Sequence, residues 1–195
     1  MSDRPALTPE SLTRTAADLA DEVGFEAVTV SAVARRVGVK PASVYFHLAG
    51  TDDLRGRISA LALTELGERL GLALAGRAGR DALAALVDAV RTFATEHPGR
   101  WESTQVRITA PEAEPAGARV GALMLAVVRG YGLPESEQTH VVRLIGSTVN
   151  GFVRLHVTGG FDRSDPDPEE SWSRMTQALD TALTHWPTAG QEPTT

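Results

Sequence analysis

The residues with the clearest chemical pattern lie in a stretch, residues 27–51, that contains no acidic side chain. Basic residues lie within this stretch or just after it: Arg35, Arg36, Lys40, Arg55 and Arg57. The whole chain has a net charge of −6, which disfavours nonspecific coating of nucleic acid. A basic segment in an acidic chain suits contact between one small face and a polyanion. A chance gap in the acidic residues is the alternative.

Residues arranged for catalysis are absent from the sequence. There is no cysteine, which excludes disulfides, thiolate zinc sites and cysteine nucleophiles. The sequence has no Gly-rich phosphate loop after a strand, no His-Glu-x-x-His and no Gly-x-Ser-x-Gly, and its 5 histidines lack ligand spacing. We therefore expect no cofactor, no metal and no enzyme, with an all-α enzyme as the least favoured alternative.

The basic segment has the build of a helix-turn-helix, in which two short helices are joined by a glycine-containing turn. Thr29 is placed to cap the first helix and Gly38 to end it. Its buried face is expected to consist of Val30, Val33, Ala34 and Val37. Pro41 opens a second helix to about Leu48, and its length of roughly 12 Å matches the major groove of DNA. Taken alone, this pattern favours DNA binding and an ordinary helical bundle equally.

The rest of the chain also favours helices, and it shows no strand periodicity, internal repeat or low-complexity tract. Helices are expected from Thr8 to Gly24, over 52–74, 83–93, 101–108, 120–131, 140–157 and 168–186. The helix at 140–157 is apolar around most of its circumference, so we expect it to be largely buried. Glu112 and Glu114 fall in a proline-rich connection that is expected to be a solvated loop.

Membrane and export signals are also missing. No run approaches the roughly 18 apolar residues of a membrane-spanning helix. Residues 1–5 lack the apolar core of a secretory signal, and the polar tail at 187–195 is expected to be frayed. These features predict a cytoplasmic protein with no membrane partner.

The first part of the chain, residues 1–60, resembles the DNA-binding domain of the TetR family of bacterial regulators. The resemblance is carried by residues 24–30 and 34–39, and above all by the run Val44-Tyr45-Phe46-His47-Leu48. This run is similar to the family's Leu-Tyr-x-His-Phe. The C-terminal half resembles the family's regulatory domains more loosely, through His97-Pro98 and residues 151–161.

This resemblance implies an all-α fold in two parts. Residues 1–55 are expected to form a three-helix helix-turn-helix domain, and residues 56–195 a helical ligand-binding and dimerisation domain. The boundary falls near the start of the long helix at 52–74.

The resemblance also implies contacts with DNA. Thr29 and Ser31 match positions that contact backbone phosphate, where hydroxyls and helix amides can both donate. Pro41, Ala42 and Ser43 match positions that face the bases; Ala42 can touch a thymine methyl, and Ser43 can form a hydrogen bond with a base.

The end of the second motif helix adds further contacts. Tyr45 and His47 match phosphate-contacting positions, and the helical phase that turns Val44 and Leu48 inward leaves Tyr45 outward. For Phe46, contact with DNA and cover of the domain are equal alternatives. Where the family has a phosphate-binding lysine this chain has Thr51, which we expect to cap the following helix. Lys40, the only lysine, can restore that charge, although a solvated surface lysine is the alternative.

In the family the last two helices of each subunit form a four-helix dimer interface, so a homodimer is implied. The expected interface residues are Gly146, Val149, Val153, Trp172, Met175, Leu179 and Leu183. A single chain could instead bury the stripe of the last helix on itself. The polar residues His140, Arg143, Ser147, Asn150 and Arg154 are expected to form a solvated or interfacial face.

A sensing pocket is expected between helices, lined by apolar groups and a few polar ones. The candidates are Phe93, Trp101, Gln105, Met124, Asn150 and His156, each of which could equally be core or surface. The sequence thus predicts a transcriptional repressor that leaves a palindromic double-stranded operator when a small-molecule effector binds. A DNA-binding architectural protein without a ligand is the alternative.

Overall fold

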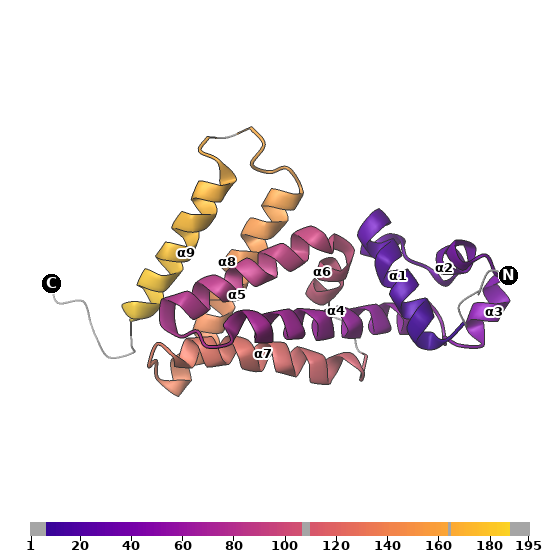
Figure 1. Ribbon diagram of the computed structural model, residues 1–195, viewed down its shortest axis with the longest axis horizontal. Helices are drawn as coiled ribbons and strands as arrows, with labels where there is room; N and C mark the ends of the chain where they lie inside the picture. The colour runs from indigo at the N-terminus through magenta and orange to yellow at the C-terminus, as the bar shows by residue number, and fades with distance from the viewer. Residues whose placement is uncertain (1–6, 107–109, 164, 188–195) are drawn as a thin grey trace. The chain divides into compact units, whose positions relative to one another are not determined.

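The computed structural model describes residues 7–106, 110–163 and 165–187, and within these ranges the chain forms helices and no strand (Figure 1). The all-α fold class expected from the sequence is therefore confirmed. In chain order the elements are α1 (Pro9–Val23), the 3-10 helix η1 (Phe25–Ala27), α2 (Val30–Val37), α3 (Pro41–Tyr45), α4 (Thr51–Leu74), α5 (Gly79–Glu96), α6 (Pro98–Gln105), α7 (Ala113–Arg129), α8 (Glu135–Val157) and α9 (Pro168–Thr184).

By their contacts the residues divide into two compact units. Unit 1 comprises Met1–Glu68 and Phe93–Val120, and unit 2 comprises Arg69–Thr92 and Gly121–Thr195. Helix α6 falls in unit 1 because it packs against α1, and the domain boundary expected near residue 55 stays a prediction. No described helix is long and apolar enough to cross a bilayer.

Local capping signals fix where α1 begins and ends. The Thr8 hydroxyl accepts the Ser11 N–H at 3.1 Å, and the Ser11 hydroxyl accepts the Thr8 N–H at 2.9 Å. This reciprocal pair satisfies two donors at the start of the helix, and Pro9 occupies its first position. Gly24 ends α1 with φ at +89°, a conformation that favours glycine.

The helix-turn-helix is built by α2 and α3. Thr29 caps α2 by accepting the Ala32 N–H at 3.1 Å, and Gly38 ends it in the left-handed conformation, both as expected. The second helix is shorter than the expected span to Leu48. It ends at Tyr45 because the His47 N–H bonds to the Val44 carbonyl, three residues back, and a turn replaces the last helical residues.

A continuous core holds α2 and α3 against α1 and the start of α4. It contains Val30, Val33, Ala34, Val44 and Leu48, each buried as the helical phase predicted, whereas Val37 is only partly buried against it. The core also includes Leu12, Ala16, Ala17, Leu19, Ala20, Phe25, Val28, Leu54 and Ile58. The helices of the motif are too short to be stable alone, so this burial fixes their orientation.

The long helix α4 begins differently from the expectation. Thr51 is its first residue rather than its cap, because the Leu54 N–H donates to the Gly50 carbonyl at 3.1 Å. The carboxylate of Asp53 accepts the Ala49 N–H at 2.8 Å, which ties the first turn of α4 to the segment that precedes it.

Helices α6 and α7 start earlier than the hydrophobic pattern indicated. Helix α6 begins at Pro98 and ends at Gln105, since proline suits a first helical position. Its expected end at Ile108 lies outside the described residues. Glu114, expected in a loop, lies in the first turn of α7, where a carboxylate suits the helix dipole.

In unit 2, α8 and α9 pack against each other. The expectation that α8 is largely buried is wrong: one stripe of the helix is buried, consisting of Gln138, Val141, Ile145, Val149 and Val153. The other faces of α8 are exposed or half-buried, because its neighbours within the chain cover one side.

Helix α9 begins as the sequence indicated, with Asp167 accepting the Glu169 N–H at 2.8 Å and Pro168 in the first position. Polar contacts fix it within unit 2. The Trp172 indole donates to Asp88 at 2.7 Å, and the Tyr131 hydroxyl donates to Asp180 at 2.7 Å. Residues 188–195 of the expected frayed tail lie outside the described range.

Candidate DNA-binding interface

The residues that the sequence assigned to DNA all lie in unit 1, at the start of α2, along α3 and at the start of α4 (Figure 1). We call this set the DNA-binding face: Thr29, Ser31, Lys40, Pro41, Ala42, Ser43, Tyr45, Phe46, His47 and Thr51. Most of these residues are exposed, whereas Ser43, His47 and Thr51 are half-buried. None is part of the core, so every one of them leaves at least part of its side chain accessible to a partner.

The start of α2 presents hydroxyls together with helix amides. The oxygen of Thr29 accepts the Ala32 N–H, so its hydroxyl hydrogen stays available to a further acceptor. Ser31 is exposed on the same first turn. The positive end of the helix dipole and these donors together make a site suited to a phosphate oxygen.

Helix α3 turns two aromatic rings outward. Val44 and Leu48 are buried, while Tyr45 is 56% exposed and Phe46 is 87% exposed. A ring that is this exposed does not cover the domain, so contact with DNA stays the prediction for Phe46. An aromatic residue with so little burial contributes little to the stability of its own chain, which makes it available for contact with a partner.

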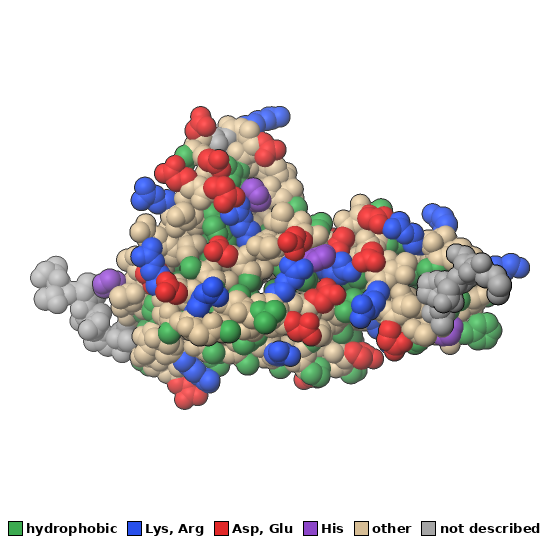
Figure 2. All heavy atoms as spheres, viewed as in Figure 1, with side chains coloured by type: hydrophobic (Ala, Val, Ile, Leu, Met, Phe, Trp, Pro, Cys, Tyr) green, Lys and Arg blue, Asp and Glu red, His purple; other side chains and the backbone are tan. Residues whose placement is uncertain are grey.

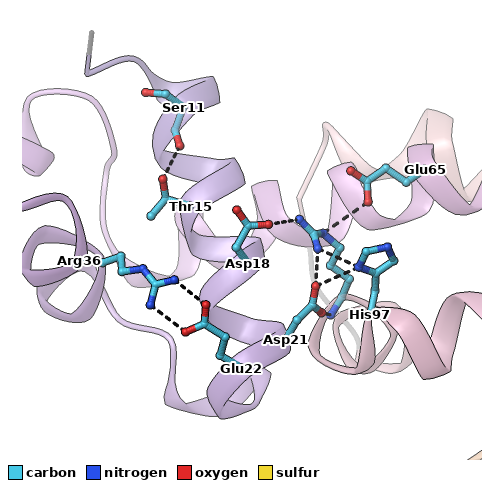
Figure 3. A network of polar contacts seen from close by, with 9 residues as sticks. Ser11, Thr15, Asp18, Asp21, Glu22, Arg36, Glu65 and His97 are labelled. Atoms are coloured by element: carbon cyan, nitrogen blue, oxygen red, sulfur yellow. Dashed lines mark hydrogen bonds and ion pairs between the residues drawn. The ribbon is translucent and has the colours of Figure 1, made fainter. Parts of the chain in front are cut away.

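The basic residues near the face differ in how they are engaged. Arg36 pairs with Glu22 of α1 through both terminal guanidinium nitrogens, one of them at 2.7 Å (Figure 3). Arg55 donates to the Glu26 carbonyl at 2.6 Å, and Arg57 pairs with Asp53 at 2.9 Å. The hydrogen bond from Arg36 lowers the pKa of Glu22, so this pair is fully ionised at neutral pH.

Arg35 and Lys40 are exposed and form no ion pair with any residue that the structure describes. Figure 2 shows blue, purple and green side chains at the surface over α2 and α3. The sequence singled out Lys40 among the basic residues of this segment, but it does not show that Glu22 and Glu26 reach back to Arg36 and Arg55. The free positive charge is therefore concentrated on Arg35 and Lys40, on either side of the turn.

The residues proposed for a sensing pocket are distributed over both units. In unit 1, Phe93 and Trp101 are buried and Gln105 is exposed. In unit 2, Met124, Asn150 and His156 are half-buried, and the His156 ring stacks on Phe152 at 6.4 Å. These residues stay candidates for a pocket.

Two open grooves lie elsewhere. A groove of about 250 Å³ is lined by residues of α1 and α4 with Glu112, and a groove of about 500 Å³ by residues from the end of α4 and from α5. None of the residues proposed for the sensing pocket lines either groove.

Most of the residues proposed for a dimer interface are already buried within their own chain. Val149, Val153, Trp172, Leu179 and Leu183 are buried in unit 2, and Met175 is half-buried. Gly146 is half-buried, and a Cβ added to it would meet no atom within 4 Å. An interface on α8 and α9 would therefore use the faces beside this buried stripe.

The fold and the exposed face define a helix-turn-helix protein with a helical C-terminal part. Residues 12–58 match the N-terminal domain described as bacterial regulatory proteins of the tetR family. Residues 83–179 match a C-terminal domain described as tetracyclin repressor-like. The HTH-type transcriptional regulator Rv0681 of Mycobacterium tuberculosis is 31% identical over 192 residues, covering 95% of this chain and 88% of that protein.

Solved structures show the same fold. A protein of unknown function from Rhodococcus sp. RHA1 has a TM-score of 0.78 at 18% identity and covers 94% of this chain and 99% of its own. A TetR protein of Acinetobacter baumannii AYE, in complex with minocycline, has a TM-score of 0.66 at 21% identity and covers 93% of this chain and 97% of its own.

The chain belongs to the TetR family of bacterial transcriptional regulators. Its N-terminal helix-turn-helix is a DNA-binding domain, and the matched families are regulators rather than enzymes.

Proposed function

We propose that this regulator is a repressor that binds a palindromic operator as a homodimer and leaves it when a small molecule binds the C-terminal part. The observation that carries the proposal is the DNA-binding face. It combines exposed donors and an exposed aromatic pair in a stretch without acidic residues, and the buried Val44 and Leu48 fix its orientation. A surface with this composition suits an extended polyanion.

Each element of the face has a distinct role in this proposal. Helix α3 enters the major groove, where Pro41, Ala42 and Ser43 face the base edges. Thr29 and Ser31 donate to the phosphate backbone from the start of α2, and Tyr45 and His47 donate to it from the end of α3. Lys40 and Arg35 add positive charge without an ion pair to be broken first.

Dimerisation is supported by the composition of the faces that α8 and α9 leave uncovered. Small residues are accessible on both helices, among them Gly151 on α8 and Ala178 on α9. Small side chains allow helices to approach closely, and a two-fold axis through such a contact would present two copies of α3 to successive major grooves. The palindromic operator follows from that symmetry.

Release by an effector is supported by the match to a tetracyclin repressor-like C-terminal domain and by the relative solved with minocycline. A ligand can release DNA only if it binds the DNA-free conformation more tightly than the bound one. The candidate pocket residues named above are the first positions to substitute once a ligand is found.

Selection of duplexes from a random pool tests DNA binding directly. We expect the retained sequences to share an inverted repeat and to resist competitor DNA in a gel shift. Failure to retain any duplex at low salt would contradict the proposal. A screen of small molecules for release of the selected duplex then separates an effector-controlled repressor from an architectural protein, which would show no release.

A further inference from the structure

A buried arginine connects α6 to the DNA-binding helices. Arg100 lies in the first turn of α6, and its side chain is only 9% exposed. Its guanidinium reaches Asp18 of α1 at 2.6 Å, pairs with Asp21 of α1, and lies 3.4 Å from a carboxylate oxygen of Glu65 on α4. It also lies 3.0 Å from the Nδ1 atom of His97. Figure 3 shows Asp18, Asp21, Glu65 and His97 converging on this one group.

The backbone of α6 is attached to α1 as well. The Arg100 N–H donates to Asp21 at 2.9 Å, and the Phe25 N–H of η1 donates to Glu102 at 3.0 Å. Gly99 approaches α1 so closely that an added Cβ would lie 2.1 Å from the carbonyl of Ala20. Because backbone atoms cannot move aside as a side chain can, only glycine allows this approach.

Stability alone does not explain why a charged group is buried at Arg100. Burial lowers the pKa of Arg100, but Asp18, Asp21 and Glu65 raise it more, so the guanidinium stays charged. A buried ion pair often stabilises a fold no better than apolar residues of similar volume would. What the Arg100 cluster adds is a fixed geometry. A planar guanidinium that is bonded on several sides permits only one arrangement of its partners.

We propose that Arg100 is a positioning residue for DNA binding. By fastening α6 to α1, it fixes the DNA-binding face relative to α4 and α6. In the dimer this would set the spacing at which two such faces engage DNA. The inference rests on the dimeric DNA binding proposed above. Arg100 does not touch DNA in this scheme, and it acts through Asp21 and α1.

The test compares three duplexes: the one selected by the wild-type protein, the same duplex with one half-site scrambled, and the same duplex with one base pair added at its centre. In Arg100→Met we expect affinity for the selected duplex to fall by about tenfold, within the range of typical coupling between sites. Affinity for the duplex with one half-site should not change, and the preference for the original spacing should be lost. The control Arg129→Met removes an exposed arginine from α7, outside the DNA-binding face and the proposed dimer faces, and should alter none of these values.

Two further variants keep the proposal open to contradiction if Arg100→Met does not fold. The double variant Arg100→Met/Asp21→Asn removes both charges and leaves no unpaired carboxylate at Asp21. Gly99→Ala separates the two backbones without changing a charge. We expect both variants to lose the spacing preference while keeping helical content in circular dichroism.

Retention of the spacing preference by the folded variants would overturn the proposal. So would an equal loss of affinity for the duplexes with one and two half-sites, or unfolding of all the variants, because each shows a structural role in the domain itself. Absence of DNA binding by the wild-type protein would instead contradict the proposed function.

Discussion

Two adjacent exposed rings in α3 differ in what they can offer to DNA. Tyr45 carries a hydroxyl that can donate to a phosphate oxygen, whereas Phe46 has no polar atom in its side chain. Phe46 can contact a thymine methyl group or a sugar instead. The pair therefore offers one backbone contact and one apolar contact from neighbouring positions.

Phosphate contacts and base contacts are expected to respond differently to substitution. Tyr45→Phe removes a donor to the backbone, so it should weaken binding to all duplexes about equally. Ser43→Ala should change the preference at one position of each half-site by about 1–3 kcal/mol. Competition gel shifts with a set of single-base variants measure both effects. Equal binding by the wild type and Tyr45→Phe would remove Tyr45 from the interface.

Phe46→Ala separates DNA contact from stability. Because the ring is 87% exposed, its removal should change the free energy of unfolding by no more than about 0.5 kcal/mol. DNA affinity should fall. The matched control is Phe25→Ala, which empties a buried site and should cost about 3–5 kcal/mol of stability. Unchanged DNA affinity in Phe46→Ala would place the ring outside the interface.

For single residues, the sequence predicts which way a side chain faces better than it predicts which residue that side chain contacts. The helical phase placed Val44 inward and Tyr45 outward, and the structure confirms both. The phase did not show that Arg36 is occupied by Glu22, because that contact joins two helices whose packing is set by the core. Nor could it place Phe46, whose exposure depends on where α3 ends.

Among the elements, α2 combines a structural cap with a proposed DNA contact in one residue. Thr29 caps the helix and also faces the proposed phosphate, so an alanine at this position would affect both. Thr29→Ala should therefore cost about 1 kcal/mol of stability in addition to DNA affinity.

Thr29→Asp distinguishes the two roles. Aspartate is as good an N-cap as threonine, so the melting temperature should be retained. Its negative charge would face a phosphate, so DNA affinity should fall below that of Thr29→Ala. Thermal melts and gel shifts on the same preparations give both values. Normal DNA binding by Thr29→Asp would show that this end of α2 is not close to the backbone.

Elements with strong local signals could be predicted, and those set by packing could not. Thr8, Thr29 and Gly38 mark helix ends through their own hydrogen bonds or conformation, and the structure confirms them. The starts of α6 and α7 were placed too late because their first turns carry few apolar residues. The burial of α8 was overestimated for a related reason: composition shows that a face is apolar but not whether the same chain covers it.

For the whole molecule, a test of the dimer depends on whether an apolar residue is already covered by its own chain. Leu179 belongs to the expected interface, yet it is only 4% exposed within its own chain. An arginine there would have to be buried in unit 2, so Leu179→Arg would report on folding rather than on dimerisation. A clean test needs a residue on α8 or α9 that has open space beside it in the isolated chain.

Gly146 of α8 meets this requirement, because a Cβ added there meets no atom within 4 Å. Gly146→Arg should leave each subunit folded, since arginine favours a helix more than glycine does by about 1 kcal/mol. If α8 faces a second copy at this position, the arginine pair would hold the subunits apart, and sedimentation should show monomers that have lost affinity for the selected duplex. The control Gly121→Arg makes the same change at an exposed glycine of α7, where an added Cβ also meets no atom within 4 Å, and should remain dimeric. A dimeric Gly146→Arg protein with normal DNA affinity would show that the interface lies on another face.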